Sequence, residues 1–244
     1  MTQFNIYFFD TLNSTNEKLK ELLSDSDIPE FSVVVTNFQT AGRGQEGNSW
    51  ESERGKNLTA SILLKPEFLS PDRQFYISKA VSLALADTLR SFDISAGIKW
   101  PNDIYAGDSK IAGILIENSI MGAGISESIA GIGLNVNQEV FLSDAKDPVS
   151  MKNIKGREFD VAEVRDILLK NLKRYYDLLK SGGEKEIDEK YFSVLYRRKG
   201  IFRFKDQKGE FSASIEDIEP MGFLILKDTK GRKRLYAFKE VEFL

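Results

Sequence analysis

The chain has 244 residues, of which 41% are hydrophobic and 29% are charged, and its formal net charge is −3. This length and composition are typical of a globular chain with one large domain and room for a small one. The slight acidic excess argues against a nucleic-acid-binding protein, which needs a clear surplus of lysine and arginine. No segment has the pattern of an export signal or a membrane span, so we expect no membrane partner.

Neither cysteine nor histidine occurs in the sequence. This excludes disulfides, cysteine or histidine metal sites, and nucleophiles that are activated by histidine. Catalysis would have to use carboxylates, lysine, arginine and backbone dipoles. Such groups suit attack by a ready-made nucleophile on a phosphate, which needs positioning and charge neutralisation. The absence of cysteine fits a reducing compartment, so we expect a cytoplasmic protein.

The predicted elements mix helices and strands. In chain order they are a helix that begins with a Ser-x-x-Glu capping box at Ser14, strands at 31–36 and 58–64, a helix at 71–92, a strand pair at 110–117 and 128–135 joined by a hairpin connection, and helices at 161–181 and 184–195. Long loops are expected at 37–57 and 138–157, and such loops are often functional. From residue 200 short alternating runs predict a small all-β module, so we place the domains at 1–197 and 198–244.

The first long loop contains the segment QTAGRGQEGNSW at residues 39–50. Its G-x-G-x-x-G spacing over 42–47 leads into a strand instead of a helix, which excludes a dinucleotide-binding fingerprint. The glycines can bring backbone N–H groups to an anion, Arg43 can hold a phosphate or carboxylate, and Trp50 can cover a flat ring. On this segment alone, a mobile surface turn with a solvated Arg43 is an equally good interpretation.

Three further features carry candidate chemistry. In KWPND, residues 99–103, Asp103 is a candidate Mg²⁺ ligand beside phosphates, whereas Trp100 is expected in the core. Lys110 starts an apolar strand and is either a solvated strand end or a clamp for an anion. In GIGLNVN, residues 131–137, glycines within an apolar strand indicate either a close backbone approach or a β-bulge.

Together and in this order, these segments resemble the catalytic core of the biotin–protein ligase family. The matching residues are Ser14, Thr15 and Asn16, and the segments 39–50, 99–103, 110–117 and 131–135. The resemblance implies an α+β fold: a mixed-sheet catalytic domain, related to class II aminoacyl-tRNA synthetases, with a small C-terminal SH3-like β-barrel. It also implies an ATP-dependent enzyme that forms biotinyl-5′-AMP from biotin and Mg-ATP and transfers biotin to a lysine of a biotin carboxyl carrier protein.

The resemblance also implies roles for individual residues. Those expected to bind biotin or to close over the intermediate are Ser14, Thr15, Asn16, Gln39, Gly42, Arg43, Gly44, Gln45, Lys110 and Gly113. Those expected to contact the nucleotide are Trp50, Asn102 and Asn135. Lys110, Arg43 and Asp103 are the expected catalytic residues, and Asp103 would bind Mg²⁺ or orient the incoming lysine.

The chain departs from many of these relatives at Gln45 and Asn48, where arginine is common. We therefore expect weaker retention of the adenylate. A predicted strand begins within a few residues of Met1, so we expect no N-terminal helix-turn-helix domain and no DNA partner. Many relatives form homodimers, but no interface strand can be identified from the sequence. The alternatives are a lipoate- or octanoate-protein ligase-like enzyme and a non-catalytic biotin-binding module.

Overall fold

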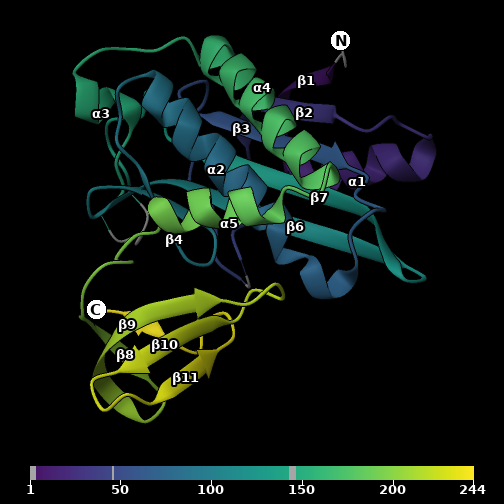
Figure 1. Cartoon of the computed structure of the whole chain (residues 1–244). Coiled ribbons are helices and arrows are strands. Elements are labelled where there is room, and N and C mark those ends of the chain that lie inside the picture. Colours follow the sequence, from purple (N-terminus) through teal and green to yellow (C-terminus); the bar gives the residue numbers. More distant parts are fainter. Residues whose placement is uncertain (1–3, 46, 143–146) are drawn as a thin grey trace.

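The computed structural model describes residues 4–45, 47–142 and 147–244. Its centre is a seven-stranded sheet in the order β1-β2-β3-β7-β6-β5-β4 (Figure 1). The strands are β1 (Asn5–Leu12), β2 (Ser32–Gln39), β3 (Leu58–Leu64), β4 (Gly97–Lys99), β5 (Asp103–Ala106), β6 (Ser109–Met121) and β7 (Gly124–Leu134). β1 and β2 are parallel and the other neighbours are antiparallel. This mixed sheet confirms the predicted α+β class.

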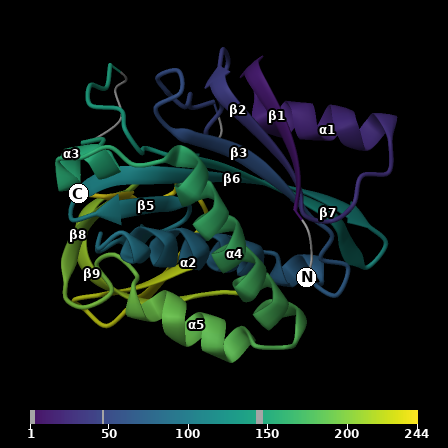
Figure 2. The ribbon, with the colours of Figure 1, turned by 90° about the horizontal axis from the view of Figure 1, so that it is seen from above.

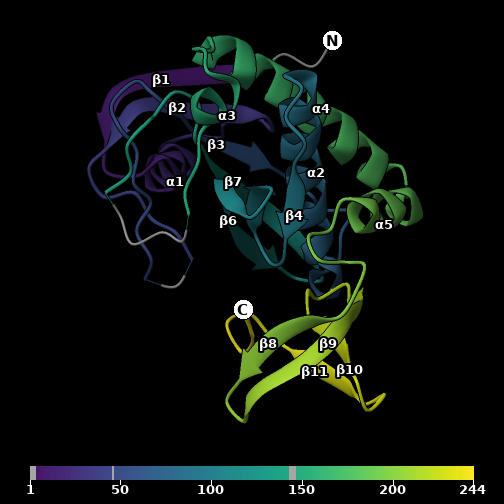
Figure 3. The ribbon, with the colours of Figure 1, turned by 90° about the vertical axis from the view of Figure 1, so that its left-hand side faces the viewer.

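Helices cover both faces of this sheet. They are α1 (Thr15–Asp25), a 3₁₀ turn (Pro71–Arg73), α2 (Phe75–Ser91), α3 (Met151–Lys155), α4 (Val161–Lys180) and α5 (Glu184–Ser193). Helix α1 lies on one face, and α2, α4 and α5 lie on the other (Figures 2 and 3). None of the helices in the described part of the chain has the length and apolar character needed to cross a bilayer.

The strands place different residues on the two faces because successive side chains alternate. On β3, Leu58, Ala60, Ile62 and Leu64 belong to the large core beneath α2 and α4. The residues between them face α1, and among these Ser61 contacts the first residues of that helix. On β7 the alternate positions 131 and 133 on the same face are glycines. The α1 face therefore carries polar and small residues at its centre, which leaves room for a ligand.

Three local predictions are corrected by the structure. The hairpin connection expected at 118–127 is mostly strand, because β6 continues to Met121 and β7 begins at Gly124. The loop expected at 138–157 contains α3, which Ser150 and Asn153 cap. Helix α1 begins as predicted, but Ser14 makes no side-chain capping bond. The parts of the two predicted loops at residues 46 and 143–146 lie outside the described residues.

The C-terminal segment forms a second, antiparallel sheet below the first in Figure 1. Its strands are β8 (Phe202–Asp206), β9 (Gly209–Ile218), β10 (Leu224–Asp228), β11 (Lys233–Tyr236) and β12 (Glu242–Phe243), in the order β11-β10-β9-β8-β12. Where an SH3-like barrel was expected, the described strands form this sheet with β11 and β12 at its edges. The all-β character is as predicted, and the boundary at 197/198 stays a prediction.

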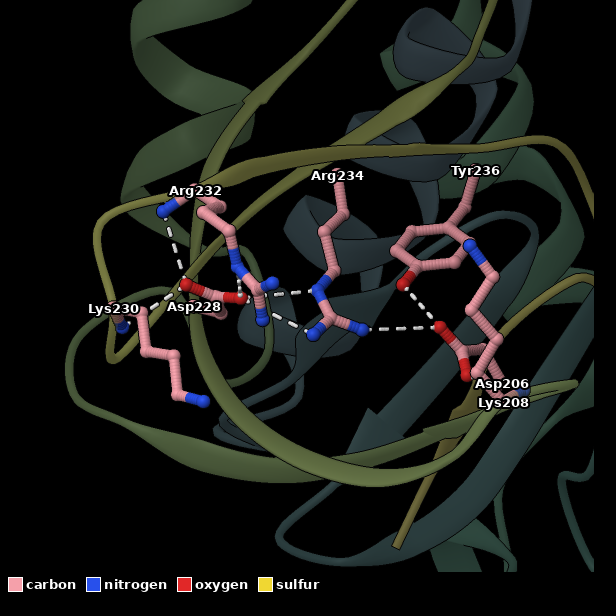
Figure 4. Close-up of polar contacts among 7 residues, drawn as sticks. All are labelled: Asp206, Lys208, Asp228, Lys230, Arg232, Arg234 and Tyr236. Atoms are coloured by element: carbon pink, nitrogen blue, oxygen red, sulfur yellow. Dashed lines mark hydrogen bonds and ion pairs between the residues drawn. The ribbon is translucent and has the colours of Figure 1, made fainter.

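A buried carboxylate organises one end of the second sheet (Figure 4). Asp228 accepts hydrogen bonds from the backbone N–H groups of Lys230 and Arg232 and from the guanidinium groups of Arg232 and Arg234. Burial raises the pKa of Asp228, but these hydrogen bonds outweigh that effect and lower it to about 2. Arg234 also pairs with Asp206, so it links two turns of the sheet.

Candidate active site

A cavity of about 480 Å³ opens on the α1 face of the large sheet and extends to the second sheet. The predicted site residues that line it are Ser14, Thr15, Asn16, Gln39, Arg43, Gly44, Gln45, Trp50, Asn102, Asp103, Lys110 and Gly113. Gly42 and Asn135 were also predicted, but they are not among its lining residues. Segments that are far apart in the sequence thus meet around one space.

The end of the cavity beside α1 is a closed set of polar side chains. Gln39 Oε1 accepts a 2.8 Å hydrogen bond from the Thr15 backbone N–H. Ser61 Oγ lies 2.7 Å from Thr15 Oγ1 and 2.5 Å from Asn16 Oδ1, and the Asn16 amide donates to Glu117 at 2.7 Å. Because these buried groups hold one another, donors and acceptors are fixed in place before a ligand arrives.

Glu117 connects this polar end to the glycine-rich loop. It accepts hydrogen bonds from Asn16 and Lys20 and lies 3.7 Å from the Arg43 guanidinium, which is also 3.5 Å from Glu17. Burial raises the pKa of Glu117, but the bonds from Lys20 and Asn16 lower it more, so the net shift is downward. The two residues of the predicted capping box therefore make other contacts instead of capping α1. Glu17 pairs with Arg43, and Ser14 lines the cavity.

Two glycines form a flat floor beneath Trp50. Gly113 on β6 and Gly133 on β7 are paired across the strands. A Cβ atom at Gly133 would lie 2.2 Å from Trp50 Cε2, and one at Gly113 would lie 3.0 Å from Cζ3. A Cβ atom at Gly131 would lie 2.3 Å from Asn16 Oδ1. The close backbone approach predicted for GIGLNVN is confirmed, because larger residues here would displace Trp50 and Asn16.

A lysine–aspartate pair stands beside the indole. Lys110 Nζ is 2.6 Å from Asp103 Oδ1 and 5.7 Å from the centre of the Trp50 ring. Asn102 donates to the Ile114 carbonyl at 2.8 Å, which ties the KWPND turn to β6. The cavity therefore presents a cation that is oriented by a carboxylate and an aromatic ring, and such a pair can bind a carboxylate or phosphate next to a planar base.

Gly42 and Asn135 support the site from outside its lining. A Cβ atom at Gly42 would lie 2.5 Å from the Trp50 carbonyl oxygen, so a larger residue would push the loop open. Asn135 is buried and donates to the Val149 carbonyl at 3.1 Å, which fastens the segment before α3 to the end of β7. The nucleotide contact of Asn135 stays a prediction.

Several lining residues were not predicted as site residues, among them Thr59, Lys99, Lys239, Val241, Glu242 and Phe243. The last four lie on β12 and the turn before it. Ser61 was not predicted either; it does not line the cavity but holds Thr15 and Asn16, and its place in the otherwise apolar strand LTASILL could have indicated it. Trp100 is buried as expected, and its indole donates to the Gly222 carbonyl at 2.9 Å while its ring packs against Phe238, so the second sheet is held beside the KWPND turn.

A mixed sheet with a fixed polar pocket, an oriented lysine and a glycine-rich loop on one face fits the catalytic domain of a ligase. Comparison with known proteins specifies this class further. The sequence model of the Biotin/lipoate A/B protein ligase family matches residues 8–137. The chain belongs to that family.

Its relatives also resemble it well beyond that region. It is 32% identical over 240 residues to the bifunctional ligase/repressor BirA of Bacillus subtilis, covering 96% of this chain and 72% of that protein. It is 29% identical to the biotin–[acetyl-CoA-carboxylase] ligase of Paracoccus denitrificans, covering 93% and 95%. The structure of biotin protein ligase from Aquifex aeolicus in complex with biotin and ATP matches with a TM-score of 0.82 and 25% identity, over 98% of each chain. The predicted resemblance is confirmed.

Proposed function

We propose that this protein is an ATP-dependent biotin–protein ligase that forms biotinyl-5′-AMP from biotin and Mg-ATP and transfers biotin to a lysine of a biotin carboxyl carrier protein. One observation carries the proposal: the fixed polar end around Asn16 shares a cavity with the Lys110 ammonium and the Trp50 indole. The polar end suits the ureido ring of biotin, the cation suits its carboxylate, and the indole suits adenine.

In the first step, a carboxylate oxygen of biotin attacks the α-phosphorus of ATP. An acyl-phosphate bond forms, and pyrophosphate leaves with the electrons of the broken P–O bond. The carboxylate is already a nucleophile, so the step needs no general base, which agrees with a chain that lacks histidine. Lys110 would neutralise the charge that gathers between carboxylate and phosphate, and Asp103 would hold its ammonium group in place.

In the second step, the uncharged amine of the carrier lysine attacks the acyl carbon of the adenylate. AMP leaves with the electrons of the C–O bond, and the proton that the amine loses as the amide forms passes to water. Lys110 would stabilise the departing phosphate. We assign to Asp103 the orientation of the incoming amine, because its carboxylate lines the same cavity and lies 2.6 Å from Lys110 Nζ.

Mg²⁺ that enters with ATP would add positive charge beside the phosphates. In the described ranges, no cluster of three or more acidic side chains could hold a metal ion. Asp103 nevertheless fits the role, because nucleotide-bound Mg²⁺ keeps several waters and takes only one or two carboxylates from a protein. The expected cytoplasmic location belongs to the same proposal. The oligomeric state is left open by the sequence, and light scattering of the purified protein measures it.

Pyrophosphate release by the purified protein with Mg-ATP tests the proposal, comparing biotin with lipoate and octanoate. We expect release with biotin, followed by biotin on the carrier lysine when a carrier domain is added. The matched control is a carrier domain in which that lysine is arginine. Release only with lipoate or octanoate would assign the protein to that part of its family, and release with none of them would indicate a non-catalytic module.

A further inference from the structure

The phosphate-binding charge of this site is not concentrated in its glycine-rich loop. Within the described part of the loop, Arg43 is the one cation that lines the cavity, whereas Gln45 and Asn48 are neutral. Arg43 already faces Glu17 and Glu117, and Lys110 faces Asp103. A triphosphate carries several negative charges, so further cations are needed to bind it well.

Two other lysines line the cavity, both where it meets the second sheet. Lys99 donates to the neutral Tyr105 hydroxyl at 2.9 Å, and its ammonium lies 5.6 Å from the Phe243 ring of β12. Burial lowers the pKa of Lys99, as expected for a cation whose charge is partly removed from water. Lys239 is exposed at the mouth of the cavity on the turn before β12. Glu242 is the acidic residue that lines this part of the cavity, so the two lysines leave it with an excess of positive charge.

The turn that carries Lys239 is fixed to the catalytic domain. Its neighbour Phe238 packs against Trp100, with ring centres 5.4 Å apart, and against Phe75 at 6.1 Å. Three residues after Lys239, β12 begins and pairs with β8. Lys239 is therefore held near the KWPND turn from both sides, and it is one of the residues that line the cavity.

The backbone of Lys239 is also unusual. Its φ of +66° lies in the left-handed region, where glycine is the ordinary residue and a lysine is strained. Residues held in such conformations cluster at functional sites. A glycine would relieve the strain here, but it would remove the charge from the cavity mouth.

We propose that Lys239, together with Lys99 on the wall of the same cavity, binds the β- and γ-phosphates of ATP and stabilises pyrophosphate as it leaves. In an in-line displacement the leaving group departs on the side opposite the attacking oxygen. With biotin at the α1 end and the α-phosphate at Lys110, that side is the one where Lys239 and residues of β12 line the cavity. The second sheet lies below the large sheet in Figure 3. The inference rests on the proposed function. It means that a residue of the C-terminal segment helps pyrophosphate to leave in the first chemical step.

Lys239→Gly tests this assignment, because it removes the charge while favouring the observed backbone. We expect the KM for Mg-ATP and the inhibition constant of inorganic pyrophosphate to rise together by roughly 5- to 30-fold, since charge-assisted hydrogen bonds are lost. The KM for biotin should stay unchanged, and the melting temperature should not fall. Lys239→Arg should keep both constants within about threefold of the wild-type values. Lys227→Ala, at an exposed position of the same sheet, is the matched control.

Two outcomes would overturn the inference: unchanged constants for ATP and pyrophosphate in Lys239→Gly, or an equal rise in the KM for biotin. Isothermal titration of wild type and Lys239→Gly with inorganic pyrophosphate measures the same contact without any turnover. If the wild type forms no biotin-dependent adenylate, the proposed function fails. The titration still decides whether Lys239 binds pyrophosphate.

Discussion

Replacing Gly133 with alanine tests whether the contact between Trp50 and the glycine floor builds the nucleotide site. The added Cβ would lie 2.2 Å from Trp50 Cε2, so the indole would have to retreat by about 1.2 Å to reach the ordinary contact distance of 3.4 Å. A displacement of about 1 Å in a site that positions reacting groups can cost on the order of 100-fold in rate. We expect Gly133→Ala to slow biotinyl-AMP formation by about that factor.

The assay is single-turnover formation of biotinyl-AMP, and two variants serve as controls. Gly113→Ala adds a Cβ only 3.0 Å from Trp50 Cζ3, a milder conflict, so its effect should be smaller. In a Trp50→Ala background the clash disappears, and adding Gly133→Ala should then cost little more. An equal loss from Gly133→Ala with and without the Trp50 ring would refute the reasoning, because the effect would then come from the strand itself.

Three further predictions follow from contacts in the cavity and in the second sheet. Asn16→Ala removes the amide that Glu117 and Ser61 hold. The KM for biotin, measured by initial rates, should therefore rise roughly tenfold while the KM for ATP stays constant. An equal rise in both KM values would contradict a biotin-specific role. Lys110→Ala should lower the rate of pyrophosphate release by about 10²- to 10³-fold, and a loss smaller than about tenfold would remove Lys110 from the chemical step. The pKa of Asp228 is about 2, against an ordinary 3.8, so its contribution to stability is present above about pH 4 and is lost as the pH falls towards 2. The difference in melting temperature between wild type and Asp228→Asn should therefore shrink over that interval, and a constant difference would show that the carboxylate charge is not responsible.

Much of the site could be predicted because its chemistry lies in short segments. Thr15, Asn16 and Gln39 were expected around one ligand, and the structure places them within hydrogen-bonding distance of one another or of Ser61. The glycines of GIGLNVN indicated a close approach, and Asn16 and Trp50 make it. Periodicity also gave β3 with the correct ends, because a fully buried β-branched and aliphatic run leaves little choice of structure.

The remaining features depend on contacts between distant segments. Nothing near Lys239 in the sequence indicates the cavity, because its position follows from the packing of Phe238 on Trp100. The capping box at Ser14 was a sound local prediction, but the pairing of Glu17 with Arg43 overrides it. Helix α3 was missed because five residues are too few to show a helical period, and its stability comes from capping.

Native mass spectrometry of the protein incubated with biotin and Mg-ATP tests the central claim most directly, namely that this one cavity makes and holds biotinyl-5′-AMP. The account predicts a complex whose added mass is that of biotinyl-5′-AMP, formed only when both substrates are present and much reduced in Gly133→Ala. A complex with biotin alone or ATP alone, unchanged when both are supplied, would contradict it.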